Sequence, residues 1–322
     1  MDWTETRNDR RGIKDHVSVA LRGFAMGAAD VVPGVSGGTM AFILGIYEEL
    51  IHAIHAVDLI FIRRLLTFRF REAFAHFPWR FLLALALGIG TAILTLASGL
   101  NWALHNHPEL VWAFFFGLVL SSVFVVRKRV KRWTPYAFLL TALAALGGYL
   151  LVGIVPVETP DAPWFLFLSG ALAIAAMILP GISGAFILVL LGKYHYVLNA
   201  VVTRDIVTLL IVIAGAGVGL ITFARLLRWM FTNYHDLTVA VLIGLIIGAL
   251  RKVWPWKEIV SGSGETILES NILPQAFTTD VAFALALMGV GFGLVLILDY
   301  MALRNVRQKG IGITQEDHQE AF

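Results

Sequence analysis

Long apolar segments alternate with short polar ones along most of the chain. Several approach the roughly 20 apolar residues that a helix needs to cross a bilayer: 81–100, 110–126, 136–155, 206–227, 237–250 and 281–300. The composition agrees, because 58% of the residues are apolar and 15% are charged, whereas soluble domains have about 45–50% and about 25%. With a mean hydropathy of +0.79, the chain is predicted to be an all-α polytopic membrane protein.

The rest of the sequence makes several kinds of segment and site unexpected. The first residues are polar and Arg-rich, with no short apolar region leading to a small-residue cleavage site, so we expect no cleavable signal peptide. Cysteine is absent, which excludes disulfides and thiolate metal sites. No histidine pair has a carboxylate at ligand spacing, so neither a metal nor another cofactor is expected. Nothing in the pattern indicates a nucleic-acid partner.

One segment recurs within the chain. ADVVPGVSGGTMAFILGIY (29–47) matches AMILPGISGAFILVLLGKY (176–194), with a shift of 180 − 33 = 147 residues. Further on the shift falls to 127, where Gly88/Gly215, Gly90/Gly217, Trp102/Trp229 and Asn106/Asn233 match. Because Pro, Gly, Trp and Asn match in step, we interpret this as a duplication. The predicted parts are a tail (1–16), a first membrane repeat (17–155), a second, inverted repeat (156–303) and a second tail (304–322), with an external loop over 255–280.

The basic residues orient these segments. If the N-terminus is cytoplasmic and each Pro-Gly element returns to its starting side, nearly all of the 25 Lys and Arg residues lie in the cytoplasm. The exceptions are Lys193, Arg204, Arg251, Lys252 and Lys257. This asymmetry follows the positive-inside rule. Both termini are therefore predicted to be cytoplasmic, in a multi-pass protein of the bacterial cytoplasmic (inner) membrane.

Each half is predicted to contain three full spans and one broken element, which places the second half on the opposite side. The result is an inverted-topology repeat, as in many secondary transporters. A broken element is either a re-entrant hairpin or two full spans, since both return the chain to the same side. Length favours the hairpin, because arms over 17–32 and 35–50 are each about 24 Å long, shorter than a roughly 30 Å hydrocarbon core.

The breaks contain the groups that an anion site needs. A helix that restarts after Pro-Gly has N–H groups without intrahelical partners and partial positive charge at its start. Hydroxyls add donors, and glycines let a ligand approach the backbone. The helix-break residues are Pro33, Gly34, Pro180 and Gly181, and the substrate-binding candidates beside them are Ser36, Gly37, Gly38, Thr39, Ser183 and Gly184. The alternative is that these small residues only allow close helix packing, which we expect for Gly88, Gly90, Gly215 and Gly217.

Asp30 stands immediately before the first break, and its counterpart in the second repeat is Met177. Because acids inside membranes are costly and usually functional, Asp30 is predicted to be an ion-coupling residue. A proton is favoured over sodium, since one carboxylate makes a poor sodium site. The alternative is that Asp30 caps a helix or pairs with Arg22, which is itself a candidate phosphate ligand. Tyr47 and Tyr194 are expected in the interfacial aromatic belt.

GAADVVPGVSGGTMAFILGIYEELI (27–51) and LPGISGAFILVLLGKY (179–194) resemble the bacterial undecaprenyl-phosphate (polyprenyl-phosphate) translocases, a family long without a known function. The resemblance extends over about residues 17–300. It implies a transporter and not an enzyme, whose partner is the lipid undecaprenyl phosphate. In this family the carrier lipid is returned from the outer to the cytoplasmic leaflet, where it serves again in cell-envelope synthesis.

Two other functions remain open. The Pro-Gly-x-Ser element also resembles undecaprenyl-pyrophosphate phosphatases, but these have an arginine close to the serine and a glutamate-rich partner element. Here Gly37-Gly38 and Gly184-Ala185 stand instead, and only Asp30 could act as a base. A secondary transporter of a small anion fits the helix ends equally well, and only the resemblance argues against it. The sequence does not decide the coupling ion, the oligomeric state or the exact lipid.

Overall fold

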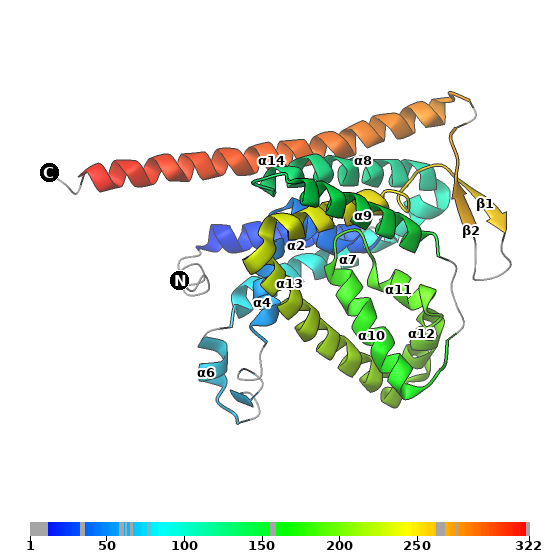
Figure 1. The fold of residues 1–322 in the computed structure, drawn as a ribbon, viewed down its shortest axis with the longest axis horizontal. Coiled ribbons are helices and arrows are strands. Elements are labelled where there is room, and N and C mark those ends of the chain that lie inside the picture. Colours follow the sequence, from blue (N-terminus) through cyan, green and yellow to red (C-terminus); the bar gives the residue numbers. More distant parts are fainter. Residues whose placement is uncertain are drawn as a thin grey trace.

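The computed structural model is mostly helical (Figure 1). It describes residues 12–32, 36–57, 61, 63–64, 67–75, 77–154, 159–261, 268–274 and 276–319. The first half contains α2 (Ile13–Asp30), α3 (Gly37–Ile43), α4 (Tyr47–His55), α6 (Phe70–Ala75), α7 (Trp79–Asn106), α8 (Pro108–Val126), η1 (Arg127–Arg129) and α9 (Pro135–Val152). The second half contains α10 (Pro163–Ile178), α11 (Gly184–Leu190), α12 (Tyr194–Thr203), α13 (Ile206–Ala249), β1 (Lys257–Ser261), β2 (Leu268–Asn271) and α14 (Thr279–Gln319).

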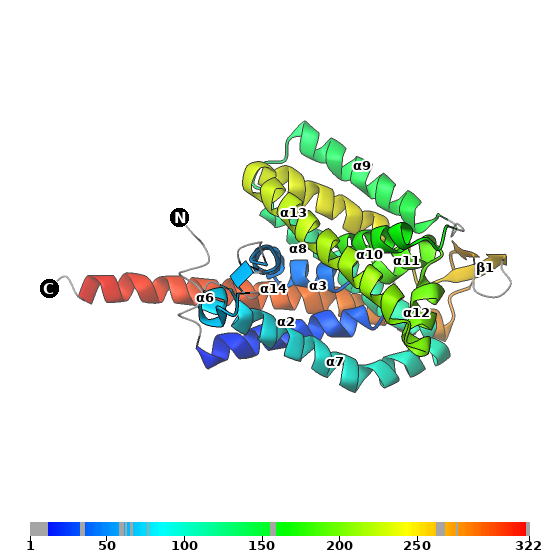
Figure 2. The same ribbon diagram turned by 90° about the horizontal axis from the view of Figure 1, so that it is seen from below.

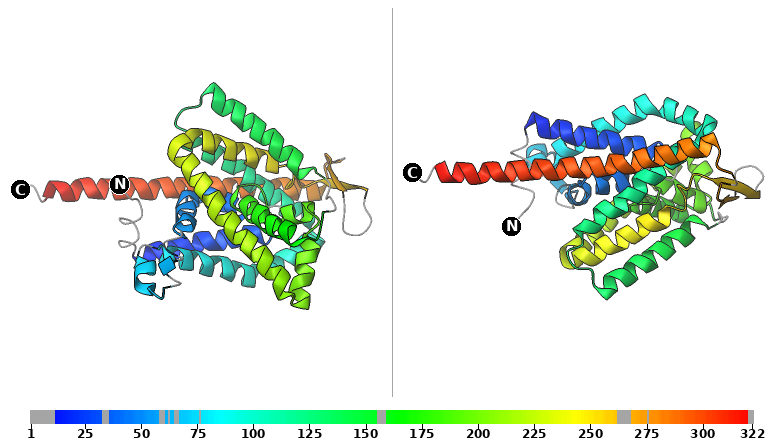
Figure 3. Two further views of the ribbon diagram at one scale, coloured as in Figure 1. Left: turned by 60° about the horizontal axis from the view of Figure 1, so that its bottom comes forward. Right: turned by 90° about the horizontal axis from the view of Figure 1, so that it is seen from above.

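Five described helices are long and apolar enough to cross a membrane: α7, α8, α9, α13 and α14. This confirms the prediction of a polytopic helical membrane protein. The 44 residues of α13 would extend about 66 Å if straight, roughly twice the thickness of a hydrocarbon core. The helix bends at Tyr234, where the backbone leaves helical geometry, and its two arms correspond to the separate spans predicted over 206–227 and 237–250 (Figure 3).

Apart from α6 and η1 in the first half and the β1–β2 hairpin in the second, the two halves have the same order of helices. Gly37 begins α3 and Gly184 begins α11, a separation of 184 − 37 = 147 residues. Trp79 begins α7 and Ile206 begins α13, a separation of 206 − 79 = 127 residues. These are the two shifts found in the sequence, so matching residues occupy matching places in the fold.

The same turn follows the first long helix of each half. His107, between α7 and α8, has φ −140° and ψ 56°, and Tyr234, at the bend of α13, has φ −136° and ψ 46°. One residue earlier, the side chain of Asn106 donates to the carbonyl of Trp102 at 2.7 Å. Asn233 donates to the carbonyl of Trp229 at 2.8 Å. The repeated asparagines therefore make the same side-chain hydrogen bond to the preceding helical turn in both halves.

Glycine contacts hold the broken element of each half against the following long helix. A methyl group on Gly88 of α7 would lie 2.0 Å from the carbonyl oxygen of Ala20 on α2. A methyl group on Gly215 of α13 would lie 1.9 Å from that of Phe167 on α10. The predicted packing role is correct for these two glycines. It is wrong for Gly90 and Gly217, where an added methyl group would meet open space.

The two halves interlock. α2 packs on α7 and α10 packs on α13 within one half, whereas α8 packs on α14 and α9 packs on α13 across the halves. Figure 2 shows α2 beside α7 on one side of the molecule and α9 beside α13 on the other. Two helices of the first half, α8 and α9, therefore pack against helices of the second half.

The second arm of each broken element differs from the prediction, which had one helix over 35–50. α3 ends at Ile43, Gly45 takes φ +75°, and α4 begins at Tyr47. In the second half Gly192 takes φ +63°, and α12 is bent by 105° from α11. Glycine tolerates positive φ because it has no Cβ, so it can end a helix here. Both glycines stand in otherwise apolar segments, which favoured one continuous helix, so the turn was not predicted.

Two predicted polar segments contain regular structure, and one expectation is wrong. The predicted loop over 255–280 contains an antiparallel hairpin, β1–β2. α14 continues as helix into the predicted tail over 304–322 as far as Gln319, and the cytoplasmic position of this tail stays a prediction. Tyr47 is fully buried against Phe42 and Phe231, so it does not belong to the interfacial belt.

The glycine contacts lead to a matched stability test. Gly88→Val and Gly215→Val should each destabilise the protein by about 1–3 kcal/mol, because a side chain there forces apart helices that touch through their backbones. Gly90→Val and Gly217→Val should have much smaller effects. Thermal unfolding of the four variants in detergent measures the difference, and equal midpoints for all four would contradict the observed helix contacts.

Candidate functional site

The first break lies between the end of α2 and the start of α3. The Oδ1 atom of Asp30 accepts a hydrogen bond from the N–H of Gly37 at 2.6 Å. The Oγ atom of Ser36 accepts one from the N–H of Gly38 at 3.1 Å. Both glycine N–H groups are predicted to bind substrate, and both have protein acceptors in this structure. Asp30 thus caps α3, as one of the two alternatives from the sequence proposed.

The predicted helix-break residues Pro33 and Gly34 lie outside the described residues. In the second copy, Pro180 and Gly181 are buried, and Gly181 takes φ +89°. That backbone conformation favours glycine. Ser183 precedes α11 at the N-cap position without a side-chain capping bond, and a methyl group on Gly184 would lie 2.6 Å from the carbonyl oxygen of Ala173. The second break therefore packs closely on α10.

The two breaks meet in the interior. The N–H of Gly181 donates to the Oγ1 atom of Thr39 at 2.8 Å, across 142 positions of the sequence. The Ser36 hydroxyl lies 3.5 Å from the carbonyl oxygen of Met177, and a methyl group on Gly38 would lie 2.8 Å from that of Ile178. Ser36 and Thr39 are 3% and 1% exposed. The candidate residues of the first break and the turn of the second thus form one buried junction.

Arg22 lies two helical turns before Asp30 on α2 and is half-buried. Eight residues of helix separate their Cα atoms by about 12 Å along the axis. The hydrogen bond described for Asp30 is to Gly37. The pairing of Asp30 with Arg22 and the role of Arg22 as a phosphate ligand stay predictions.

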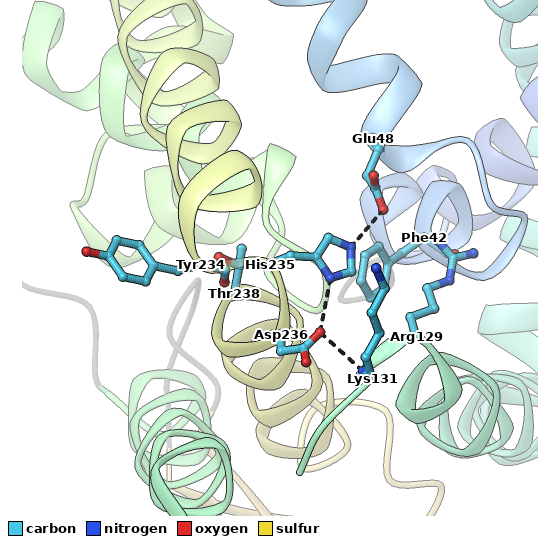
Figure 4. A network of polar contacts seen from close by, with 8 residues as sticks. All are labelled: Phe42, Glu48, Arg129, Lys131, Tyr234, His235, Asp236 and Thr238. Carbon is cyan, nitrogen blue, oxygen red and sulfur yellow. Dashed lines mark hydrogen bonds and ion pairs between the residues drawn. The ribbon is translucent and has the colours of Figure 1, made fainter. Parts of the chain in front are cut away.

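A polar network at one end of the molecule was not predicted from the sequence (Figure 4). His235 of α13 lies 3.6 Å from a carboxylate oxygen of Glu48 on α4 and 3.3 Å from one of Asp236. Asp236 accepts hydrogen bonds from the backbone N–H groups of Lys131 and Arg132 at 3.2 and 2.9 Å. The network joins α4, the α8–α9 connection and the bend of α13, three segments far apart in the chain.

A cation lies at the bend of each broken element. Arg129 donates to the carbonyl of Phe42 at 3.0 Å, near the end of α3, and its guanidinium lies 5.3 Å from the centre of the Phe42 ring. Lys193, which precedes α12, is only 2% exposed; its ammonium donates to the carbonyl of Thr159 at 2.7 Å and pairs with Asp161. Sequence reasoning used both cations only to orient the chain, with Arg129 on the cytoplasmic side and Lys193 outside. The signal it could have used is the glycine turn beside Lys193.

The described part of the chain contains no group of three or more His, Asp or Glu side chains that could hold a metal ion. The polar groups described at the junction are hydroxyls, backbone N–H groups and one carboxylate. The hydroxyls and N–H groups could donate hydrogen bonds to an anion, whereas the carboxylate would repel one.

Comparison with known proteins identifies the family. The family described as undecaprenyl phosphate translocase-like matches residues 26–270. The chain belongs to this family. A polyprenyl-phosphate transporter of Vibrio cholerae is 40% identical over 300 residues, which cover 89% of this chain and 97% of that protein. A polyprenyl-phosphate transporter of Staphylococcus aureus is 34% identical over 253 residues, covering 73% and 85%. No solved structure matches.

The match confirms the resemblance that the two Pro-Gly motifs indicated. It also confirms that the chain is related to transporters and not to enzymes, because both relatives are named as transporters. The phosphatase alternative is therefore set aside. The matched region spans both breaks and every described helix from α3 to α13.

The junction between the breaks can be tested through Thr39. Thr39→Val has nearly the same shape but removes the acceptor of the Gly181 N–H, which should cost about 1–3 kcal/mol because a buried donor is left unpaired. Thr39→Ser keeps the hydroxyl and should cost less. The measurement is the thermal midpoint in detergent, and a Thr39→Val protein as stable as Thr39→Ser would mean that this hydrogen bond does not hold the breaks together.

Proposed function

We propose that this chain transports undecaprenyl phosphate from the outer to the cytoplasmic leaflet of the bacterial inner membrane, so that the carrier lipid can be used again in envelope synthesis. The support comes from the family and from two relatives named polyprenyl-phosphate transporters. The described spans fit a multi-pass membrane protein. The observation that carries the mechanism is the buried junction where Thr39 binds Gly181.

The phosphate is held at this junction. Its oxygens accept hydrogen bonds from the same kinds of donor that the breaks supply, namely the N–H groups of Gly37 and Gly38 and the hydroxyls of Ser36 and Thr39. Ser183, Gly184 and Arg22 complete the candidate set. Irregular backbone at this depth is tolerated where it is buried in protein or lines a cavity, and the described residues of both breaks meet the first condition.

Asp30 occupies part of this site in the present structure. One N–H cannot serve its carboxylate and a phosphate oxygen equally, so substrate binding requires Asp30 to release Gly37. Two negative groups at one site also repel each other. A proton taken up by Asp30 removes its charge and weakens it as an acceptor, which frees the donor for the phosphate. Asp30 is thus the coupling residue, with a proton favoured over sodium.

The repeated helix order supports an inverted repeat of 17–155 and 156–303. Such repeats carry a substrate by rocking about a site near the membrane midplane. The start of α2 and the far end of α14 lie at the same end of the molecule, and the β1–β2 hairpin lies at the other (Figure 1). This arrangement agrees with two cytoplasmic termini and an external hairpin.

A leaflet-resolved assay tests the function. Purified protein in liposomes should increase the rate at which labelled undecaprenyl phosphate reaches the opposite leaflet, with and without imposed pH and sodium gradients. Liposomes without protein give the background rate. An excess of inorganic phosphate should not compete strongly, because it lacks the lipid chain. Transport of inorganic phosphate and not of the lipid would favour the small-anion alternative instead.

Asp30→Asn should keep lipid binding but lose the acceleration by an imposed pH gradient, since asparagine can accept from Gly37 but cannot carry the proton. The matched control is Glu109→Gln, which removes an exposed carboxylate from the first turn of α8. Rates with and without the gradient are compared for both variants. A full gradient response from Asp30→Asn would leave Asp30 a structural cap only.

The orientation has its own test in this cysteine-free chain. Cysteines introduced at Asn106 and Asp161 should react with a membrane-impermeant thiol reagent added to intact spheroplasts, and one at Lys131 should react only after the membrane is opened. Labelling of Lys131 from outside would reverse the proposed topology.

A further inference from the structure

We propose that an apolar cavity beside the first break binds the prenyl segment next to the phosphate of the substrate. This inference rests on the proposed function and extends it to the lipid chain. The cavity has a volume of about 450 Å³ and lies between α2, α7, α8 and α14. Its size falls in the range of ligand pockets in proteins, roughly 300–1,000 Å³.

The cavity exists because α2 is shorter than its neighbour. The two helices touch closely along α2, where methyl groups on Gly23 and Gly27 would lie 2.3 and 2.6 Å from carbonyl oxygens of α7. α2 then ends at Asp30, whereas α7 continues to Asn106. The face of α7 beyond the end of α2 carries Leu96, Leu100 and Ala103, which line the cavity. The cavity thus lies beside the part of α7 that extends past the last turn of α2.

The walls fit a hydrocarbon chain. Phe114 of α8 and Leu287 of α14 face the leucines of α7, and the surface of the cavity is almost entirely carbon. A polar ligand would lose its hydrogen bonds to water here without replacement, whereas an apolar chain gains from burial. The cavity is large enough for a segment of a prenyl chain, and the remainder of a long chain would stay in the bilayer.

The position of the cavity connects it to the headgroup site. Ala28 at its edge is two residues before Asp30, about 3 Å along the helix axis. Asp30 holds the N–H of Gly37 that we assign to the phosphate. Positions two apart lie on nearly opposite sides of a helix, so the prenyl chain of a phosphate bound at the junction would pass around the end of α2 to reach the cavity. A free phosphate or a small anion has no apolar part to bury in this space. We therefore expect the cavity to favour a lipid phosphate.

Photo-crosslinking and transport measurements together test whether the cavity binds the prenyl chain. The probe is a polyprenyl phosphate with a diazirine in the isoprene units nearest the phosphate, added to the full-length protein in liposomes. It should label α7 around Leu96–Ala103. Leu100→Trp fills the cavity and should reduce labelling and slow transport about tenfold, equivalent to losing the burial of roughly two CH₂ groups. Leu94→Trp is the matched control, because Leu94 is on the same helix and 86% exposed.

The outcomes separate the two proposals. Labelling elsewhere, or normal transport by Leu100→Trp, would overturn the cavity assignment while leaving the transport function intact. Equal labelling of the same residues by a diazirine phospholipid would make the cavity a general lipid groove and would also overturn it. If the wild-type protein transports no undecaprenyl phosphate, the proposed function is wrong. The labelled position alone then decides whether the cavity binds a prenyl chain. Ala103→Leu, a smaller change, replaces Leu100→Trp if that variant does not fold.

Discussion

A backbone that leaves the helix inside a membrane must find its hydrogen-bond partners within the protein, because lipid offers none. The structure meets this constraint at each described turn of the two broken elements. Asp30 accepts from Gly37, Thr39 accepts from Gly181, and Arg129 donates to the carbonyl of Phe42. Thr159 donates in the same way to the carbonyl of Leu191. Side chains from other segments therefore complete both ends of α3 and the end of α11.

The duplicated fold supplies those segments. α8 packs on α14 and α9 packs on α13, so the halves are joined along two long interfaces, and the breaks are brought together between them. Arg129 reaches the first broken element from the end of α8, and Lys193 anchors the second to the residues that precede α10. Arg129 thus holds the bend after α3, and Lys193 holds the bend after α11. Each of these two cation contacts lies within one half, so relative movement of the halves would act on the Thr39–Gly181 contact instead.

The same groups that satisfy the breaks are the ones that a phosphate would use. A carboxylate and a phosphate are both anionic oxygen acceptors, so a bound phosphate would compete with Asp30 for the N–H of Gly37. In the proposed mechanism, this competition would link proton uptake by Asp30 to the availability of the site. The apolar cavity lies beside the same break because α2 ends there. Headgroup and chain would therefore be recognised at adjacent places for one structural reason.

The sequence by itself determined the helices, the duplication and the positions of the breaks, since apolar length, Pro-Gly turns and matched Trp and Asn residues are local signals. It also singled out Asp30 and the family. Only the tertiary structure decided that Asp30 caps α3, that Tyr47 and Lys193 are buried, and that His235 lies beside Glu48. These features depend on contacts between segments that are mostly far apart in the chain, such as Thr39 and Gly181. A local pattern specifies a helix or a turn, but the packing of distant helices decides what surrounds it.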